Sequence, residues 1–93
     1  MLQDKYAVAK EKIVKREIDG EIYLFDSKQC LVHRMDKAGK FFFNTLINNT
    51  SFASALHIIS SKYSPDVHQQ VETDFWSFCK KLQEAKVLLV GGY

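Results

Sequence analysis

The dipeptide Asp19-Gly20 lies between two β-rich runs and constrains the fold of this chain more than any other short segment. A tight two-residue turn between paired strands needs positive φ angles, which Asp and Gly adopt more readily than most residues. The segment 13–25 is therefore predicted to form a β-hairpin. A second polar turn follows at 26–28, and a third strand is predicted over about 29–35.

Three helical patterns follow the predicted strands. Asp36 is suited to cap the first helix, because its carboxylate can accept a hydrogen bond from a first-turn amide. Thr50 or Ser51 can cap the second helix in the same way. Ser64-Pro65 predicts the start of the third, since a proline at the first helical position loses no hydrogen bond. The residues that recur at helical spacing are Ala38, Phe41, Phe42, Thr45 and Leu46; Phe52, Ala55, Leu56, Ile59 and Tyr63; and Val67, Val71, Phe75, Phe78 and Leu82.

The 93 residues are predicted to form one small α+β domain with a winged helix-turn-helix outline, a three-stranded antiparallel sheet followed by three helices. We divide the chain into a polar lead-in over 1–12, frayed or weakly helical, a domain over 13–90, and a loose tail over 91–93. The third helix is expected to end at 85 or 86, and residues 87–90 to form a short closing strand. Because the sheet cannot bury its apolar face alone, the helices are expected to cover it.

The charge balance does not favour nucleic-acid binding. Thirteen Lys and Arg residues against eleven Asp and Glu residues give a net charge of +2, without a strong basic patch. The segment 65–86, which a DNA-binding protein of this outline would place in the major groove, has three lysines, four acidic residues and no arginine. We therefore expect no nucleic-acid partner, and a winged-helix DNA-binding transcription regulator stays as the alternative function.

The sequence gives no sign of a membrane or secretory protein. The first residues lack the apolar segment of a signal peptide, and no apolar run approaches the roughly 18 residues of a membrane span. A cytoplasmic location without membrane contact is therefore expected, with Cys30 and Cys79 as reduced thiols.

No enzyme or metal motif is evident. The four glycines are scattered or terminal, so no phosphate-binding loop is predicted. Cys30 and His33 have Cys-x-x-His spacing, but no second pair completes the four ligands of a structural zinc site. Cys79 lies in the middle of a predicted helix, where a thiol usually behaves as a small apolar residue. We expect a non-enzymatic protein without a metal or cofactor.

Two features suggest a protein or peptide partner. Trp76 lies beside the apolar stripe of the third helix, where it either anchors a partner or widens the buried stripe. The third strand is an edge of the predicted sheet and can accept an extended peptide as an added strand. Its charges can instead blunt the edge and leave it unused. On this strand Leu31, His33 and Met35 share one face, and Cys30, Val32 and Arg34 share the other.

Several segments then form a pattern that covers nearly the whole chain. They are Met35-Asp36, Phe42 with Leu46, Ser51-Phe52, Tyr63, the run Val71-x-x-Asp74-Phe75-x-x-Phe78-Cys79-x-x-Leu82, and Ala85-Lys86-Val87-Leu88-Leu89. From residue 12 to residue 90 the chain resembles the PqqD-like family, also called RiPP recognition elements. Asn49 and Lys86 depart from it, because the family often has Gly at these two turns.

The resemblance implies a non-catalytic peptide chaperone in natural-product or cofactor biosynthesis. Members bind the leader segment of a ribosomally made precursor peptide. They present it to a modifying enzyme, often a radical S-adenosylmethionine enzyme, or to a leader protease. In the family the leader adds a strand to the third-strand edge and packs along the third helix.

We accordingly expect a leader peptide to pair with the backbone of residues 30–34 and to place apolar side chains in a groove along the third helix. Arg34 and Lys80 are expected to attract leader carboxylates. The predicted peptide-binding residues are Cys30, Leu31, Val32, His33, Arg34, Trp76, Cys79 and Lys80. A scaffold subunit that docks on another protein without a peptide substrate is a further alternative, and pairing of two strand edges in a homodimer stays open.

Overall fold

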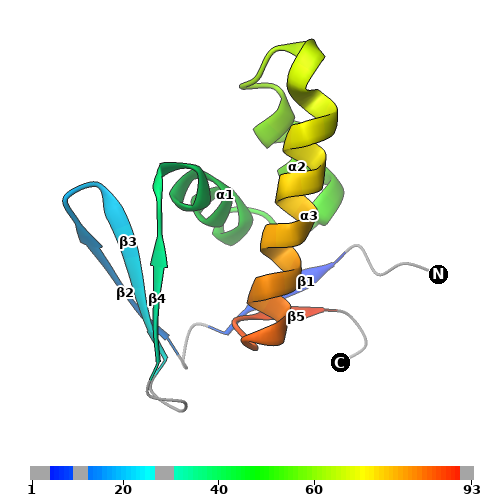
Figure 1. The fold of residues 1–93 in the computed structure, drawn as a ribbon. Helices are drawn as coiled ribbons and strands as arrows, with labels where there is room; N and C mark the ends of the chain where they lie inside the picture. Colours follow the sequence, from blue (N-terminus) through cyan, green and yellow to red (C-terminus); the bar gives the residue numbers. More distant parts are fainter. Residues whose placement is uncertain (1–4, 10–12, 27–30, 91–93) are drawn as a thin grey trace.

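The computed structural model describes residues 5–9, 13–26 and 31–90. In chain order the elements are β1 (Tyr6–Val8), β2 (Ile13–Ile18), β3 (Glu21–Asp26), β4 (Leu31–Met35), α1 (Lys37–Ile47), α2 (Phe52–Ser60), the short 3-10 helix η1 (Pro65–Val67), α3 (His68–Glu84) and β5 (Leu88–Val90). Strands β2, β3 and β4 form an antiparallel sheet that precedes the three α-helices (Figure 1). The predicted α+β class, with a three-stranded antiparallel sheet followed by three helices, is confirmed.

The hairpin turn adopts the conformation that its sequence predicts. Asp19 and Gly20 have φ angles of 54° and 81°, so both central residues are in the left-handed region. The register places Ile22 opposite Met35 and Leu24 opposite His33, on the face of the sheet that we call the inner face. Ile22, Leu24 and Met35 are buried on this face.

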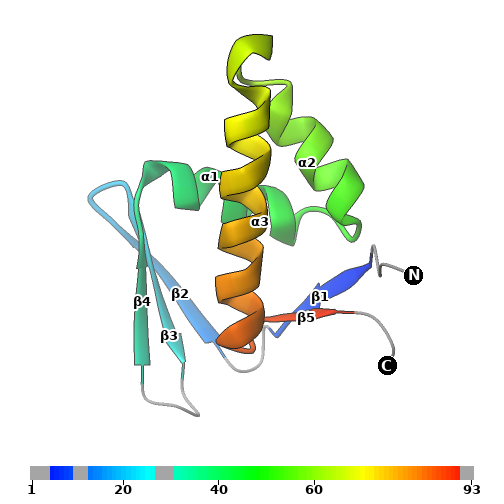
Figure 2. The same ribbon diagram turned by 45° about the vertical axis from the view of Figure 1, so that its right-hand side comes forward.

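The helices bury the inner face of the sheet, as expected. In Figures 1 and 2 the three α-helices lie on the same side of the β2-β3-β4 sheet. Two polar contacts also join α1 to β2: Lys15 Nζ donates to Asn44 Oδ1 at 3.0 Å, and Lys40 forms an ion pair with Glu17. The buried core cluster consists of Tyr6, Ile22, Leu24, Met35, Phe42, Phe43, Leu46, Phe52, Ala55, Ile59, Val71, Phe75, Cys79, Leu82, Val87 and Leu88.

Two of the three predicted helix caps form as expected. The Asp36 side chain accepts a hydrogen bond from the Gly39 amide at 2.9 Å, and Ser51 accepts one from the Ser54 amide at 3.4 Å. The third start differs, because Pro65 begins the 3-10 turn η1 and α3 begins only at His68. The Ser64 hydroxyl bonds to the Asp66 carboxylate instead of capping a backbone amide.

Within the predicted polar lead-in, the structure describes residues 5–9, and Tyr6–Val8 form a strand where a frayed or weakly helical segment was expected. Strand β1 pairs antiparallel with β5, with Tyr6 opposite Val90. The Tyr6 hydroxyl donates to the Leu46 carbonyl at 2.5 Å, and its ring lies 4.7 Å from that of Phe52. This pairing joins residues 80 to 84 positions apart, so local patterning gives no signal for it. The predicted closing strand is confirmed as β5.

The end of α3 accommodates a departure from the family pattern. Lys86 follows the helix with a φ angle of 60°, in the left-handed region where glycine is favoured. In the described parts of the chain, no helix has the length and hydrophobicity that a membrane span requires.

Candidate functional site

The outer edge of β4 is open to hydrogen bonding within the described residues. In the sheet order β2-β3-β4, β4 is terminal and pairs only with β3. Apart from that pairing, no backbone hydrogen bond between described residues involves residues 31–35. An edge strand presents unpaired N–H and C=O groups along its free side. The described structure therefore leaves this edge available to an extended segment.

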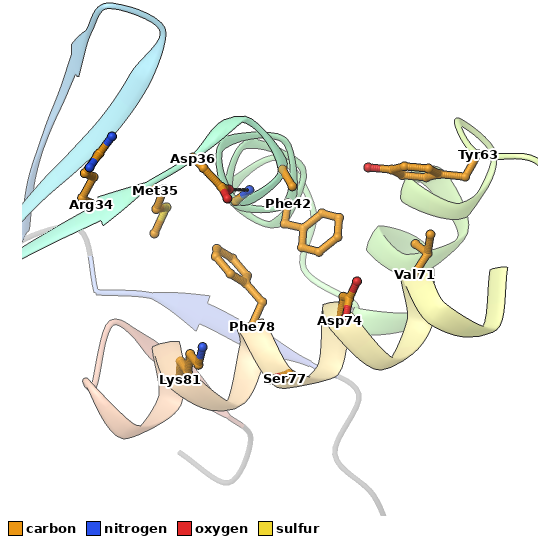
Figure 3. A pocket seen from close by; sticks show the side chains of 12 residues that line it. Arg34, Met35, Asp36, Phe42, Tyr63, Val71, Asp74, Ser77, Phe78 and Lys81 are labelled. Atoms are coloured by element: carbon orange, nitrogen blue, oxygen red, sulfur yellow. Dashed lines mark hydrogen bonds between the residues drawn. The ribbon is translucent and has the colours of Figure 1, made fainter. Parts of the chain in front are cut away.

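A groove with a volume of about 850 Å³ begins at the end of β4 and runs between the start of α1 and α3 (Figure 3). Its lining residues are Arg34, Met35, Asp36, Ala38, Gly39, Phe42, Tyr63, Val71, Asp74, Ser77, Phe78 and Lys81. The α3 positions 71, 74, 78 and 81 are spaced three or four residues apart, so they lie along one face of the helix. The volume falls within the usual range of ligand sites, about 300–1,000 Å³.

Aromatic rings form the apolar centre of the groove. The rings of Phe78 and Phe42 meet edge to face, with centroids 5.7 Å apart. Phe42 is buried and also contacts Phe75 of the core at 6.0 Å, whereas Phe78 is only partly buried. A Cβ atom at Gly39 would lie 3.3 Å from the Phe78 ring, so the glycine permits the close approach of α3 to α1. The ring of Phe78 is thus held from one side and exposed to the groove on the other.

The two ends of the groove differ in charge. Figure 3 places Lys81 near the β4 end and Tyr63 at the opposite end. Lys81 forms no ion pair with a described residue, so its ammonium is available to a ligand. Toward the Tyr63 end, the Asp74 carboxylate accepts a hydrogen bond from Gln70 at 2.8 Å.

Arg34 lines the groove, but its guanidinium is engaged elsewhere. It forms an ion pair with Glu21, with Nη2 2.6 Å from Oε1. The hydrogen bonds from Arg34 hold the pKa of Glu21 below its usual value, and the same contact raises the pKa of Arg34. In Figure 3 the Arg34 side chain points toward the β2–β3 hairpin rather than toward Phe78.

The predicted β4 residues lie along the open edge. Cys30 lies outside the described residues, and Leu31 begins β4. Val32 is exposed on the outer face, whereas His33 is half-buried on the inner face. Arg34 lines the groove, as described above. The structure therefore brings the described part of this segment to one sheet edge.

The predicted α3 residues do not line the groove. Cys79 is 1% exposed and belongs to the core, and burial raises the pKa of its thiol to about 12. Trp76 packs at 5.4 Å from Phe52 of α2 and is 42% exposed, so it both extends the buried stripe and keeps an exposed surface. Lys80 is exposed outside the groove lining. Of the two adjacent residues, Cys79 therefore faces the core and Phe78 faces this groove.

Sequence reasoning missed most of the lining residues. The missed positions include Met35, Asp36, Phe42, Tyr63, Asp74, Ser77, Phe78 and Lys81. The signal that identifies the α3 part is the spacing of Val71, Asp74, Phe78 and Lys81, which mixes apolar and charged residues along one helical face. A pattern of apolar residues alone does not identify such a face, because two of its four residues are charged.

The groove chemistry suits binding of an apolar and charged chain. Among the described residues, no group of three or more His, Cys, Asp or Glu side chains is placed to bind a metal ion. The lining contains neither a cysteine nor a histidine, so it has no thiol–imidazole pair. An open strand edge, aromatic rings and one free ammonium are the features that it offers.

Neither a protein-family model nor a curated protein matches the sequence. Among solved structures, the chain is similar to TbiB1 in complex with the TbiA(beta) leader peptide, with a TM-score of 0.74, 22% identity, and coverage of 92% of this chain and 95% of that chain. It is also similar to a lasso peptide synthetase B1 complexed with the leader peptide, with a TM-score of 0.75, 16% identity, and coverage of 91% and 98%. The protein therefore has the fold of these two leader-bound proteins, in agreement with the fold that its sequence resemblance implies.

Proposed function

We propose that this protein is a non-catalytic peptide chaperone that binds the leader segment of a ribosomally made precursor peptide and presents it to a modifying enzyme. The observation that carries the proposal is the open edge of β4 beside an apolar groove against α3. The two similar structures are both complexes with a leader peptide, which supports the same use of this fold.

Strand addition on β4 supplies the affinity of the complex. Backbone hydrogen bonds fix the leader along residues 31–35, and its alternate side chains point to the two faces of the sheet. The side chains on the inner face reach the groove, where Phe78 and Met35 provide apolar contact. Binding in the micromolar to nanomolar range requires about 8–12 kcal/mol, which one added strand with one or two anchors can supply.

The α3 side of the proposed site differs from the sequence-based expectation. Phe78 takes the place of Cys79 as the side chain that contacts the leader, because Phe78 lines the groove. Lys81 takes the place of Lys80 as the group that attracts a leader carboxylate. Trp76 lies toward α2 and is left outside the leader contact. Cys30 stays a proposed contact beyond the described residues, and Val32, His33 and Arg34 contribute mainly through the strand backbone.

The partner that receives the leader is proposed as an enzyme of the classes implied by the family resemblance, a radical S-adenosylmethionine enzyme or a leader protease. The protein itself offers a binding groove without a thiol–imidazole pair, and the Cys79 thiol is buried with a raised pKa. A division of labour follows, in which this chain holds the leader and the partner performs the reaction.

Binding to DNA receives no support. Helix α3 has two lysines, at positions 80 and 81, against three acidic residues, at positions 72, 74 and 84. A recognition helix that neutralises phosphates needs an excess of positive charge. The leader-bound proteins of similar fold provide no example of DNA recognition.

A fluorescence-anisotropy titration tests the proposal. The probe is a labelled synthetic leader, taken from the N-terminal half of a short peptide encoded beside the gene of this protein. We expect saturable binding in the micromolar range or tighter, competition by unlabelled leader, and no competition by a scrambled peptide. Absence of leader binding, together with salt-sensitive binding of duplex DNA, would favour the regulator and refute the proposal.

A further inference from the structure

The outer face of the three-stranded sheet carries an exposed apolar row. Val14 lies opposite Phe25, and Phe25 lies opposite Val32, so the three side chains are direct cross-strand neighbours. Their exposed fractions are 46%, 41% and 56%, although adjacent apolar side chains on a sheet are normally covered. In Figure 1 the helices lie on the other side of the sheet and leave this face uncovered.

A charged row lies beside the apolar row. Arg16 is opposite Tyr23, which is opposite Arg34. Glu21 is the acidic residue of β2, β3 and β4 on this face within the described residues, and Arg34 already engages it. Arg16 has no ion-pair partner among the described residues. The face therefore suits an apolar surface that brings a carboxylate to Arg16.

A leader bound on β4 would widen this face. Strands lie about 4.8 Å apart and rise about 3.4 Å per residue, so three strands of five residues present about 250 Å². By the same measure a fourth strand adds about 80 Å², which enlarges the contact by about a third; the remainder of the roughly 800 Å² that a stable interface needs from each partner must come from outside the sheet. A fourth strand on β4 would place every second leader side chain on this face, one of them beside Val32, in line with Phe25 and Val14.

We propose that this outer face is a docking surface for the modifying enzyme, and that the enzyme contacts the sheet and the outward side chains of the bound leader together. The inference rests on the proposed function. It adds how the enzyme distinguishes the protein with a bound leader, the loaded protein, from the protein without one, the empty protein. The enzyme surface is apolar and carries a carboxylate opposite Arg16. Because the leader enlarges the contact, the enzyme binds the loaded protein more tightly than the empty protein.

Charge complementarity favours an enzyme over a second copy of this chain. A second copy would offer the same outer face, on which Glu21 is held by Arg34. It would therefore bring no free carboxylate from the described part of that face to Arg16. A different protein, such as the enzyme, can bring a free carboxylate to Arg16.

Biolayer interferometry with a purified peptide-modifying enzyme encoded beside the gene tests the proposal, with and without saturating leader. We expect tenfold tighter binding of the loaded protein. Phe25→Gln should weaken that binding at least tenfold, whereas Ile58→Gln should leave it within twofold. Ile58 is a matched control, because it is 39% exposed and lies on α2, away from the sheet. Arg16→Glu should weaken enzyme binding at least fivefold, and Lys62→Glu is the matched control for the change of charge. If Phe25→Gln does not fold, the Arg16→Glu variant still tests the proposal.

The leader affinity of each variant is measured separately. A wild-type protein that does not bind the leader counts against the proposed function. Intact leader binding with unchanged enzyme affinity in both outer-face variants overturns this inference alone. The inference is also overturned if the enzyme binds neither form. The same holds if sedimentation velocity shows that Phe25→Gln abolishes self-association while enzyme affinity is unchanged, since a second copy would then occupy the face.

Discussion

Phe78 of α3 meets Phe42 of α1 edge to face, with the ring planes inclined at 79° and the centroids 5.7 Å apart. This contact fixes the ring of Phe78 between the core and the groove. Because Phe42 is itself packed against Phe75, the position of Phe78 depends on the core of the domain. The contacts with Phe42 and, through it, Phe75 therefore restrict where the Phe78 ring can lie at the apolar centre of the groove.

Replacing Phe78 by alanine should weaken leader binding by about 10- to 100-fold, or about 1.4–2.8 kcal/mol, because an aromatic wall of the groove is removed. The free energy of unfolding should fall by only about 2 kcal/mol, since Phe78 is partly buried. Trp76→Ala is the control, as it removes an exposed aromatic side chain from the same helix outside the groove. Leader anisotropy and urea unfolding measure the two effects. A large loss of leader affinity in Trp76→Ala with no loss of leader affinity in Phe78→Ala would place the leader on the α2 side of α3.

Lys81→Gln should weaken leader binding about fivefold at low salt, and the difference from wild type should shrink as salt is added. The physical reason is the loss of the free ammonium at the β4 end of the groove, which interacts with a leader carboxylate through screened electrostatics. Lys80→Gln removes the same charge from the neighbouring exposed position outside the groove. Equal effects of the two substitutions would show a general charge effect instead of a local contact.

Glu21 should make stability dependent on acid pH. The hydrogen bonds from Arg34 lower the pKa of Glu21 in the folded protein below the ordinary value of 4.5. Above that value the carboxylate is charged in both states and the stabilisation is fully present. As the pH falls below 4.5, Glu21 takes up a proton in the unfolded state before it does so in the folded state. The stabilisation therefore decreases with falling pH, and it is fully lost once the pH is below the lowered pKa of Glu21 in the folded protein.

Urea unfolding at several pH values between about 6 and 3 measures this dependence. We expect the wild-type protein to lose more stability on acidification than Glu21→Gln, by a small amount because the pair is exposed. Glu72→Gln, a substitution of an exposed residue without an ion pair to a described residue, should keep the wild-type slope. Identical slopes for Glu21→Gln and wild type would contradict a stabilising role of this ion pair.

Gly20→Ala should destabilise the hairpin by about 1 kcal/mol. The φ angle of 81° is costly for any residue with a Cβ atom, while no atom lies within 4 Å of the added methyl group. The effect is therefore one of backbone conformation alone. Gly20→Asn should lose less stability than Gly20→Ala, because Asn tolerates the left-handed region better than Ala does. Urea midpoints of the two variants test this, and equal or no loss in both would be inconsistent with the turn conformation.

The sequence was informative wherever a feature depends on neighbours along the chain. Asp19-Gly20 predicted the hairpin because the turn requirement lies in the two residues themselves. Asp36 and Ser51 predicted helix starts for the same reason, since a cap contacts amides only three residues away. The strand order and the helix order followed from these local signals, and so did the open edge of β4.

Features that depend on distant contacts were less accessible. Strand β1 forms because Tyr6 packs on Phe52 and pairs with β5, and none of these partners is near in sequence. The rotation of α3 about its axis was predicted wrongly at this point, with Phe78 in the apolar stripe and Cys79 at the peptide-binding site, because the two residues are adjacent and both suit a buried position. The structure resolves the choice through the Phe42 contact, which holds Phe78 at the groove and leaves Cys79 in the core.

In the proposed complex, a leader peptide joins the sheet at the β4 edge. The most direct measurement is nuclear magnetic resonance of the labelled protein with unlabelled leader, which records amide exchange and cross-strand contacts for residues 31–35. We expect slowed exchange of alternate β4 amides, Hα–Hα contacts with the leader, and shifts of Phe78 in α3. Unchanged exchange in β4, with shifts confined to the surface of α1 and α2, would contradict it.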